Sequence, residues 1–394
     1  MVKQRNKPTV HEMRTLVIGA GVAGLTCASL LQQLSVAPII VEREPQESFN
    51  TGGYMLGMLP LGGRVLNQLG ARDDYFASSI EMKTYEIHRE DGSLSKSYDL
   101  DFINQKYGSY RGISRSALIS VLLAGMDTSL IRYGVTVEEL KQEDNKVRVT
   151  FSDGSEEIFD LVIVADGLHS TTRTKVLNGD EYAYYNTHWG GWVAWLDEAP
   201  QTTYREYWGA ASFMGVYPVG DRIGVFIGGP GKHIQEIGRQ AFIEREKQQL
   251  TNEYPLLRHS LDAIANATDP FYWEFQDCRS SKWVKGNIVL LGDAASGFLP
   301  TAGVGASMAL DSAAALVDEL SRSDREHLDY ALNLYVRRQQ VRVEKAQQVS
   351  RNFGKMMFVK SPVVAAVRDY ALRFYTLEAM LKDLGRTIEG SVNG

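Results

Sequence analysis

Cysteine is scarce in this chain. Cys27 and Cys278 are the only two cysteines among 394 residues, and neither has a CxxC or zinc-ligand spacing. We therefore expect two free, buried thiols and no metal site. The sequence contains no run of about 18 apolar residues, so it predicts no transmembrane helix. The polar start MVKQRNKPTVHEM lacks the apolar segment of a secretory signal, and we expect a cytoplasmic protein.

An excess of charge of one sign is also missing. Lys and Arg number 42 against 48 Asp and Glu, which gives a net charge of −6 and a pI of about 5.7. This balance offers no basic surface to nucleic acid or to an anionic membrane. The hydrophobic share of 44% is typical of a globular chain, and the length is enough for two or three domains with a buried ligand site.

Glycine, in contrast, stands at positions that carry meaning. An apolar strand expected at 14–18 runs into GAGVAG at 19–24, which opens a helix, and a second strand at 38–42 ends at Glu42. In such a βαβ unit the glycines allow a tight turn and a close approach to a pyrophosphate, and the later carboxylate binds a ribose. Glu42 favours FAD or NAD over NADP, while a glycine turn without a ligand is the alternative. The candidate phosphate-binding residues are Gly19, Gly21, Val22, Ala23 and Gly24.

Two later turns follow apolar strands in the same way. The segment DLVIVADGLHSTTR places Asp166 and Gly167 directly after a buried strand at 161–165, with Arg173 following. In VLLGDAASGFLPTAGVGASMAL, Asp293 follows a strand at 287–291, and the residues 303–305 introduce a helix. Taken alone, an Asp-Gly pair is an ordinary turn. The carboxyl end of a parallel strand, however, is where such sheets bind ligands.

Together, the three turns resemble those of class A flavoprotein monooxygenases, the family of para-hydroxybenzoate and salicylate hydroxylases. The order and spacing match over roughly residues 14–350. The resemblance implies that one FAD is held from both ends, with the first turn on the adenosine pyrophosphate and Asp293 on the ribityl chain. It also implies FAD contacts from Arg43, Arg115, Asp166, Gly303, Val304 and Gly305.

The resemblance further implies a reaction. NADPH or NADH would dock transiently, O₂ would react through a C4a-hydroperoxyflavin, and an aromatic or polycyclic small molecule would be hydroxylated. Pro300 and Gly303 would lie near the reactive ring. Two positions depart from the family pattern: Ser296 stands where a histidine is frequent, and Asp311 precedes by one step the position aligned with Ser312, where an aspartate is frequent.

The predicted fold class is α/β: a Rossmann-like FAD-binding domain with a parallel sheet, an inserted antiparallel β-sheet substrate domain, and C-terminal helices. We expect a flexible tail at 1–13, an FAD-binding domain from 14–78, 101–178 and 280–350, a substrate domain from 79–100 and 179–279, and C-terminal helices at 351–394. The aromatic segment 182–230 supplies candidates for lining the substrate site: Trp192, Tyr207, Phe213 and Tyr217, with Arg205 and His188 as weaker ones.

Several functions stay open on the sequence alone. A related flavoenzyme could be an epoxidase, an antibiotic- or polyketide-modifying oxygenase, or a prenyl-lipid reductase. A nicotinamide-dependent dehydrogenase or a redox-sensing binding protein needs only the first glycine turn and leaves the other two unexplained. The expected assembly is a monomer or a homodimer. The sequence indicates no catalytic side chain, and the chemistry is expected to lie in the flavin itself.

Overall fold

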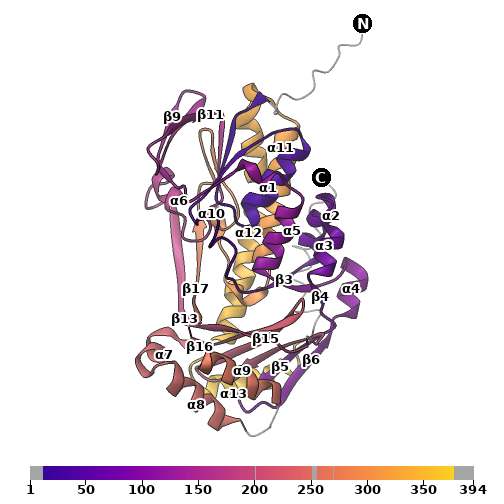
Figure 1. Ribbon diagram of the computed structural model, residues 1–394. Coiled ribbons are helices and arrows are strands. Elements are labelled where there is room, and N and C mark those ends of the chain that lie inside the picture. Colours follow the sequence, from indigo (N-terminus) through magenta and orange to yellow (C-terminus); the bar gives the residue numbers. More distant parts are fainter. Residues whose placement is uncertain (1–11, 200, 251–254, 269, 377–394) are drawn as a thin grey trace.

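The computed structural model describes residues 12–199, 201–250, 255–268 and 270–376. Residues 1–11 of the expected tail and 377–394 of the expected C-terminal helices lie outside this part of the chain. Figure 1 shows two lobes, with a parallel sheet and its helices above and a broad antiparallel sheet below. Within the described residues, none of the helices combines the length and the apolar character needed to cross a bilayer.

The upper lobe is built on a six-stranded sheet whose order is β18-β19-β12-β1-β2-β8. Pairing is parallel from β19 to β8, and only β18 runs antiparallel. Every residue of β1 and β12 is buried, as the continuous apolar runs of these strands predict for a sheet covered on both faces. The bounds are β1 Thr15–Ile18, β2 Ile39–Glu42, β8 Ile131–Tyr133, β12 Leu161–Val164, β18 Val284–Lys285 and β19 Ile288–Leu290. The four parallel strands expected from the sequence are therefore confirmed as neighbours.

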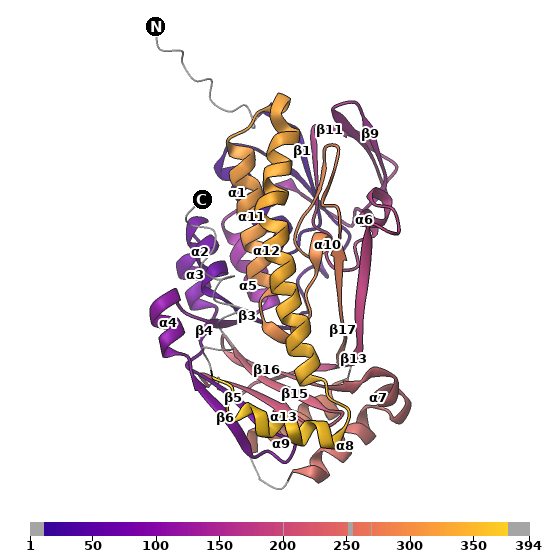
Figure 2. The same ribbon diagram turned by 180° about the vertical axis from the view of Figure 1, so that it is seen from behind.

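Helices cover one face of this sheet, and a small antiparallel sheet with the order β11-β10-β9 covers the other. The helices α1 and α11 pack on each other, and the long α12 lies against α11 (Figure 2). A serine caps α5, because the Ser114 hydroxyl accepts the Ala117 N–H at 3.1 Å. The bounds are α1 Val22–Gln33, α5 Arg115–Ala124, α11 Gly305–Ser321, α12 Leu328–Met357, β9 Val137–Glu143, β10 Lys146–Phe151 and β11 Glu156–Phe159.

The lower lobe is a seven-stranded sheet with the order β17-β13-β16-β15-β14-β5-β6. Its pairs are antiparallel except for β14 with β5, which brings the β5–β6 hairpin alongside the aromatic strands. The helices α7, α8 and α9 cover one face, and α13 packs against β6. The strands are β5 Thr84–Arg89, β6 Leu94–Asp99, β13 Tyr182–Leu196, β14 Thr203–Trp208, β15 Phe213–Val219, β16 Arg222–Pro230 and β17 Phe271–Ser280. The helices are α7 Gly231–Ile237, α8 Arg239–Gln249, α9 Pro255–Asn266 and α13 Pro362–Leu372.

A three-stranded sheet with the order β3-β7-β4 joins the two lobes, and the sequence did not predict it. Its strands are only two to four residues long, too short for alternation to be recognised. The strand β7 packs directly on β15, because a Cβ on Gly112 would lie 2.1 Å from the Pro218 carbonyl oxygen. The bounds are β3 Met55–Met58, β4 Ile80–Glu81 and β7 Arg111–Ser114. The remaining short elements are α2 Pro60–Gln68, α3 Arg72–Ala77, α4 Asp101–Tyr107, α6 Thr171–Val176, α10 Asp293–Ser296, η2 Thr128–Leu130, η3 Pro300–Ala302 and η4 Arg325–His327.

Both cysteines are free and buried, as predicted. Burial raises the pKa of the Cys27 thiol to about 12, so this group is an inert part of the core.

Candidate functional site

The first glycine turn connects β1 to α1 and leaves no room for side chains at Gly19 and Gly24. Gly19 has φ +101°, and a Cβ there would lie 2.6 Å from the Ala165 carbonyl oxygen. A Cβ on Gly24 would lie 2.0 Å from the Gly19 oxygen, so the helix could not approach the strand. At Gly21 a Cβ would meet nothing within 4 Å, which leaves open space in front of the turn. This is the arrangement that a pyrophosphate requires.

The first turn of α1 faces that space without a side-chain cap. Val22 and Ala23 are the first two residues of the helix, whose N–H groups favour an anion. The Glu42 carboxylate at the end of β2 accepts the Ala20 N–H at 2.8 Å and the Glu44 N–H at 3.0 Å. Glu42 is therefore fixed beside the turn, while Arg43 is exposed to solvent.

The two later turns meet although they are far apart in the chain. Asp166 follows β12 and Asp293 follows β19, and these strands are neighbours in the sheet. Arg173, which is fully buried, ties the turns together by donating to the Leu168 oxygen at 2.8 Å and the Ala294 oxygen at 3.0 Å. One Asp166 oxygen accepts the Thr172 N–H at 3.2 Å, and the other is buried without a hydrogen-bond partner among the described residues.

The Asp293 carboxyl is the most perturbed acid of this group. Burial raises its pKa to about 6, and the nearby positive charge of Arg173 partly opposes the shift. Tyr54 lies close enough to respond to the same carboxyl: burial and Asp293 raise the pKa of its hydroxyl, while Arg115 lowers it. Tyr54 thus brings Asp293 and Arg115 into one site. The sequence analysis missed Tyr54, which lies in the glycine-rich stretch 50–54 but at no recognisable motif spacing.

The loop from 300 to 305 closes the site from another side. Pro300 starts the short helix η3, and Gly303 adopts a left-handed conformation with φ +59°. A Cβ on Gly303 would lie 3.2 Å from the Tyr110 hydroxyl oxygen, so Tyr110, another residue that the sequence did not indicate, contacts this loop. Val304 precedes the first residue of α11, Gly305, and the helix has no side-chain cap. Its free N–H groups can stabilise negative charge in front of the loop.

The four aromatic candidates do not share one face of the sheet. Phe213 and Tyr217 lie on the face of β15 that is turned toward Met55 and Leu299 of the upper lobe. Trp192 and Tyr207 lie on the opposite face, in the core under α7 to α9. The prediction that all four line one site is therefore wrong for Trp192 and Tyr207. Side chains alternate between the two faces along a strand, and these two point to the face that the helices cover.

The two weaker candidates also lie elsewhere. Arg205 Nε donates to Glu86 Oε2 at 2.9 Å on the helix-covered face. His188 is exposed at the bulge of β13, with φ +58°. The positions that depart from the family pattern are buried in the fold. Ser296 and Ser312 are both buried. Asp311 accepts a hydrogen bond from Gln339 Nε2 at 2.9 Å and forms an ion pair with Arg342.

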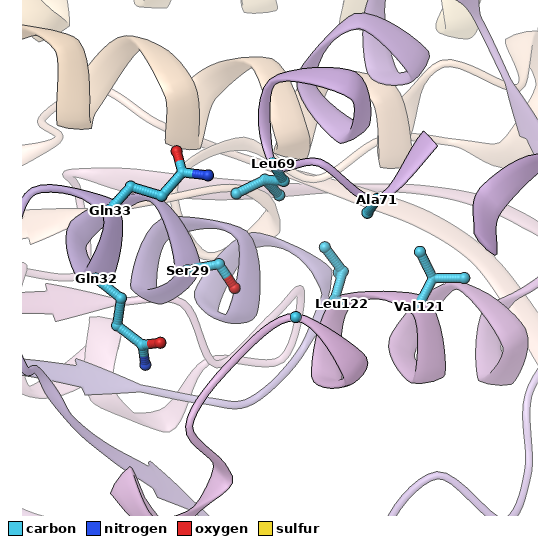
Figure 3. Close-up of a pocket in the computed structure, with 8 residues that line it drawn as sticks. Ser29, Gln32, Gln33, Leu69, Ala71, Val121 and Leu122 are labelled. Carbon is cyan, nitrogen blue, oxygen red and sulfur yellow. The ribbon is translucent and has the colours of Figure 1, made fainter. Parts of the chain in front are cut away.

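A separate hollow of about 240 Å³ lies on the outer surface of the upper lobe. Figure 3 shows Val121 and Leu122 pointing toward Leu69 and Ala71, whereas Gln32 points away from them. None of the predicted cofactor-binding residues lines it. A more polar hollow of about 640 Å³ lies beside the start of α5 and is lined by Ser114, Ser116 and the tip of the β15–β16 hairpin.

The residues at the carboxyl edge of the parallel sheet fit FAD. The open space at Gly21 and the uncapped start of α1 suit a pyrophosphate, and Glu42 suits a ribose. The unpartnered buried oxygen of Asp166 calls for a donor that the described residues do not supply, and the buried Asp293 carboxyl can accept hydroxyl donors such as those of a ribityl chain.

Comparisons with known proteins agree with this fit. The family model described as "FAD binding domain" matches residues 12–350. The chain is 29% identical over 330 residues to 3-amino-4-hydroxybenzoate 2-monooxygenase of Streptomyces cremeus, covering 78% of each chain. It is 26% identical over 378 residues to 2-heptyl-3-hydroxy-4(1H)-quinolone synthase of Pseudomonas aeruginosa, covering 92% of this chain and 94% of that one.

Among solved structures, HpxO of Klebsiella pneumoniae complexed with FAD and uric acid has the same fold. The TM-score is 0.85 at 23% identity, over 97% of this chain and 98% of that one. The family model matches most of the chain, and the residues at the carboxyl edge of the parallel sheet fit FAD. We conclude that this chain belongs to the FAD binding domain family and is a FAD-dependent monooxygenase.

Proposed function

We propose that this monooxygenase holds FAD along the carboxyl edge of its parallel sheet and hydroxylates an aromatic or polycyclic small molecule in front of the Gly303 loop. One observation carries the proposal. The first glycine turn, Asp166 and Asp293 follow β1, β12 and β19, and Glu42 is the last residue of β2; these are four adjacent parallel strands. Residues from distant parts of the sequence therefore meet at one edge, where an extended cofactor can contact all of them.

Each end of the cofactor has its own partners in this proposal. Gly19, Gly21 and Gly24, with Val22 and Ala23, hold the pyrophosphate, and Glu42 and Arg43 hold the adenosine ribose. Arg115, Asp166 and Asp293 hold the ribityl side, and Gly303, Val304 and Gly305 face the flavin ring. The supporting geometry is the shared sheet edge, the bond of Glu42 to the glycine turn, and the Arg173 bridge between the two later turns.

When bound and reduced by NAD(P)H, FAD would supply the activation of O₂, and the oxygen atom inserted into the substrate would come from that O₂. The chain supplies positioning and electrostatics. The uncapped start of α11 stabilises negative charge in front of Gly305. Pro300 and the buried Leu299 form an apolar border that excludes water from the reacting centre.

The substrate lies, in this proposal, between the Gly303 loop and the face of the seven-stranded sheet that carries Phe213 and Tyr217. We assign the two roles to two domains. Residues 14–78, 101–178 and 280–350 form the FAD-binding domain, and residues 79–100 and 179–279 form the substrate domain. By their names, one of the two relatives acts on an aminohydroxybenzoate and the other makes a hydroxylated alkylquinolone. An aromatic ring is the feature that these compounds share.

The test begins with the absorbance spectrum of the purified protein. Bound FAD gives a yellow protein, and a panel of phenols, quinolones and polyketides should include compounds that raise NAD(P)H oxidation and appear with one added oxygen atom by mass spectrometry. NAD(P)H oxidation that reduces a compound without substrate-coupled O₂ consumption would instead identify a reductase. A colourless protein that does not take up added FAD would refute the proposal.

A further inference from the structure

A buried carboxylate stands on the face of the sheet that we assign to the substrate. Glu206, on β14, is only 6% exposed. Its Oε2 accepts the Tyr85 hydroxyl at 2.6 Å and the Trp208 Nε1–H at 2.9 Å, and its Oε1 accepts the Tyr217 hydroxyl at 3.1 Å. Glu206 stands at no motif of the sequence and lies outside the proposed FAD site.

The surroundings of Glu206 are rings and not cations. Burial raises the pKa of its carboxyl, and the hydrogen bonds from Tyr85, Trp208 and Tyr217 oppose that shift. None of the cations in the described part of the chain forms an ion pair with it. A buried carboxylate held only by neutral donors keeps its negative potential instead of cancelling it.

Tyrosines connect Glu206 to the Gly303 loop. Tyr204 lies beside Tyr217, with 4.2 Å between the ring centres, and its hydroxyl interacts with that of Tyr110. The Tyr110 hydroxyl in turn contacts Gly303. The negative group and the loop that faces the flavin ring are therefore parts of one continuous polar cluster, formed by Glu206, Tyr217, Tyr204 and Tyr110.

The two oxygens of Glu206 are used unequally. A carboxylate offers about four lone-pair positions. Oε2 accepts two donors and Oε1 accepts one, so Oε1 has capacity for one more. The rest of this face is apolar, with Phe213, Phe226 and Phe275 among its buried side chains. Phe358 packs against Phe213 and Phe275, so the face combines buried aromatic rings with one strong acceptor.

We propose that Glu206 is the specificity-determining residue of the substrate site and selects a neutral fused aromatic molecule that donates a hydrogen bond from a hydroxyl or ring N–H group. The inference rests on the proposed function, since it takes the Gly303 loop as the flavin side of the site. An aromatic carboxylate is disfavoured there, because it brings a second negative charge to a buried one and no donor. Charge-assisted hydrogen bonds contribute more than neutral ones, which makes the preference measurable.

The experiment measures the affinity of the yellow holoenzyme for three matched probes by calorimetry and by the change in the flavin spectrum. The probes are 2-naphthol, 2-methoxynaphthalene, which lacks the donor, and 2-naphthoate, which carries the charge. We expect 2-naphthol to bind at least about ten-fold more tightly than either of the others. Equal or tighter binding of 2-naphthoate, or no binding of 2-naphthol, would overturn the assignment even if no variant could be purified.

Two variants then locate the effect. Glu206→Gln keeps the shape and removes the charge, and it should narrow the preference for 2-naphthol over 2-naphthoate by about ten-fold or more. The matched control is Glu86→Gln on the neighbouring strand β5, whose side chain pairs with Arg205 on the opposite face. It should leave the preference unchanged; an equal effect of both variants would contradict the assignment. If the probes fail while the protein stays yellow and oxidises NAD(P)H, only this inference falls, whereas loss of FAD binding removes the proposed function itself.

Discussion

Replacement of Asp293 by Asn separates two effects of this carboxyl: the loss of folding stability that its burial causes, and its contribution to FAD binding. Burial raises its pKa from an ordinary 3.8 to about 6, and at 1.36 kcal/mol per pKa unit this corresponds to at most about 3 kcal/mol. Below pH 3.8 the carboxyl is protonated in both the folded and the unfolded chain and costs nothing. Between pH 3.8 and about 6 the unfolded chain ionises this carboxyl while the folded chain keeps it protonated, so the free energy of unfolding falls as the pH rises, and above about 6 the loss stays constant.

In the FAD-free protein, Asp293→Asn should therefore raise stability, and the gain should grow from pH 4 to pH 6 and then stay constant. For 394 residues unfolding as one unit, about 3 kcal/mol corresponds to a rise in Tm of roughly 3 °C at pH 8. Thermal unfolding followed by circular dichroism measures it, with Asp180→Asn at an exposed position as the control.

In the presence of FAD much of this gain in stability should be offset, because weaker FAD binding costs about 1.4 kcal/mol for each tenfold loss of affinity. If Asp293 accepts hydroxyl donors of the ribityl chain, the Asn variant should bind FAD about ten- to hundred-fold more weakly, as loss of a charge-assisted hydrogen bond requires. FAD titration of the same protein samples measures this loss. The reasoning fails if the variant gains no Tm above pH 6, or if its gain is largest at pH 4.

Three further substitutions test other parts of the molecule. Gly24→Ala puts a Cβ 2.0 Å from the Gly19 oxygen, and we expect a colourless or poorly folded protein in which FAD retention per chain is sharply reduced; unchanged retention would contradict the packing argument. Glu42→Gln should weaken FAD binding by about ten-fold in a fluorescence titration, because its carboxylate fixes the first turn, and it should leave Tm without FAD nearly unchanged. Trp192→Leu should lower the free energy of unfolding by about 2 to 4 kcal/mol in urea, because its ring packs 6.2 Å from that of Phe242, with no change in substrate affinity; a lost affinity would return Trp192 to the substrate site.

Much of the upper lobe was accessible from sequence because its strands are short and apolar, and a glycine with positive φ follows β1, β12 and β19 within three residues. β1 and β12 read as continuous buried runs, and the residues directly after them need special backbone geometry. Such signals are local. The same holds for the Ser114 cap, where one hydroxyl satisfies one N–H three residues later.

The substrate side was less accessible because its important contacts are not local. Alternation along β13 and β14 shows which side chains share a face, but not which of the two faces the helices cover. The helices α7 to α9, which lie further along the chain, determine that. Tyr110 and Glu206 are 96 positions apart by their numbering and come near each other only because β14 pairs with β15 and β7 packs on β15. No spacing rule connects them.

The long helix α12 has a consequence for how the two lobes are kept in register. Its Gln347 side chain donates to the Gly297 oxygen at 2.5 Å and to the Cys278 oxygen at 2.9 Å, while Arg351 pairs with Asp277 at 2.7 Å and Met357 ends in the aromatic core of the lower lobe. The number of residues in a helix sets both the distance and the rotation between its two ends. One residue inserted between 347 and 351 would advance the far end by about 1.5 Å and turn it by about 100°, so the salt bridge and the apolar end would face the wrong way together. The length of this stretch is thus as constrained as its composition.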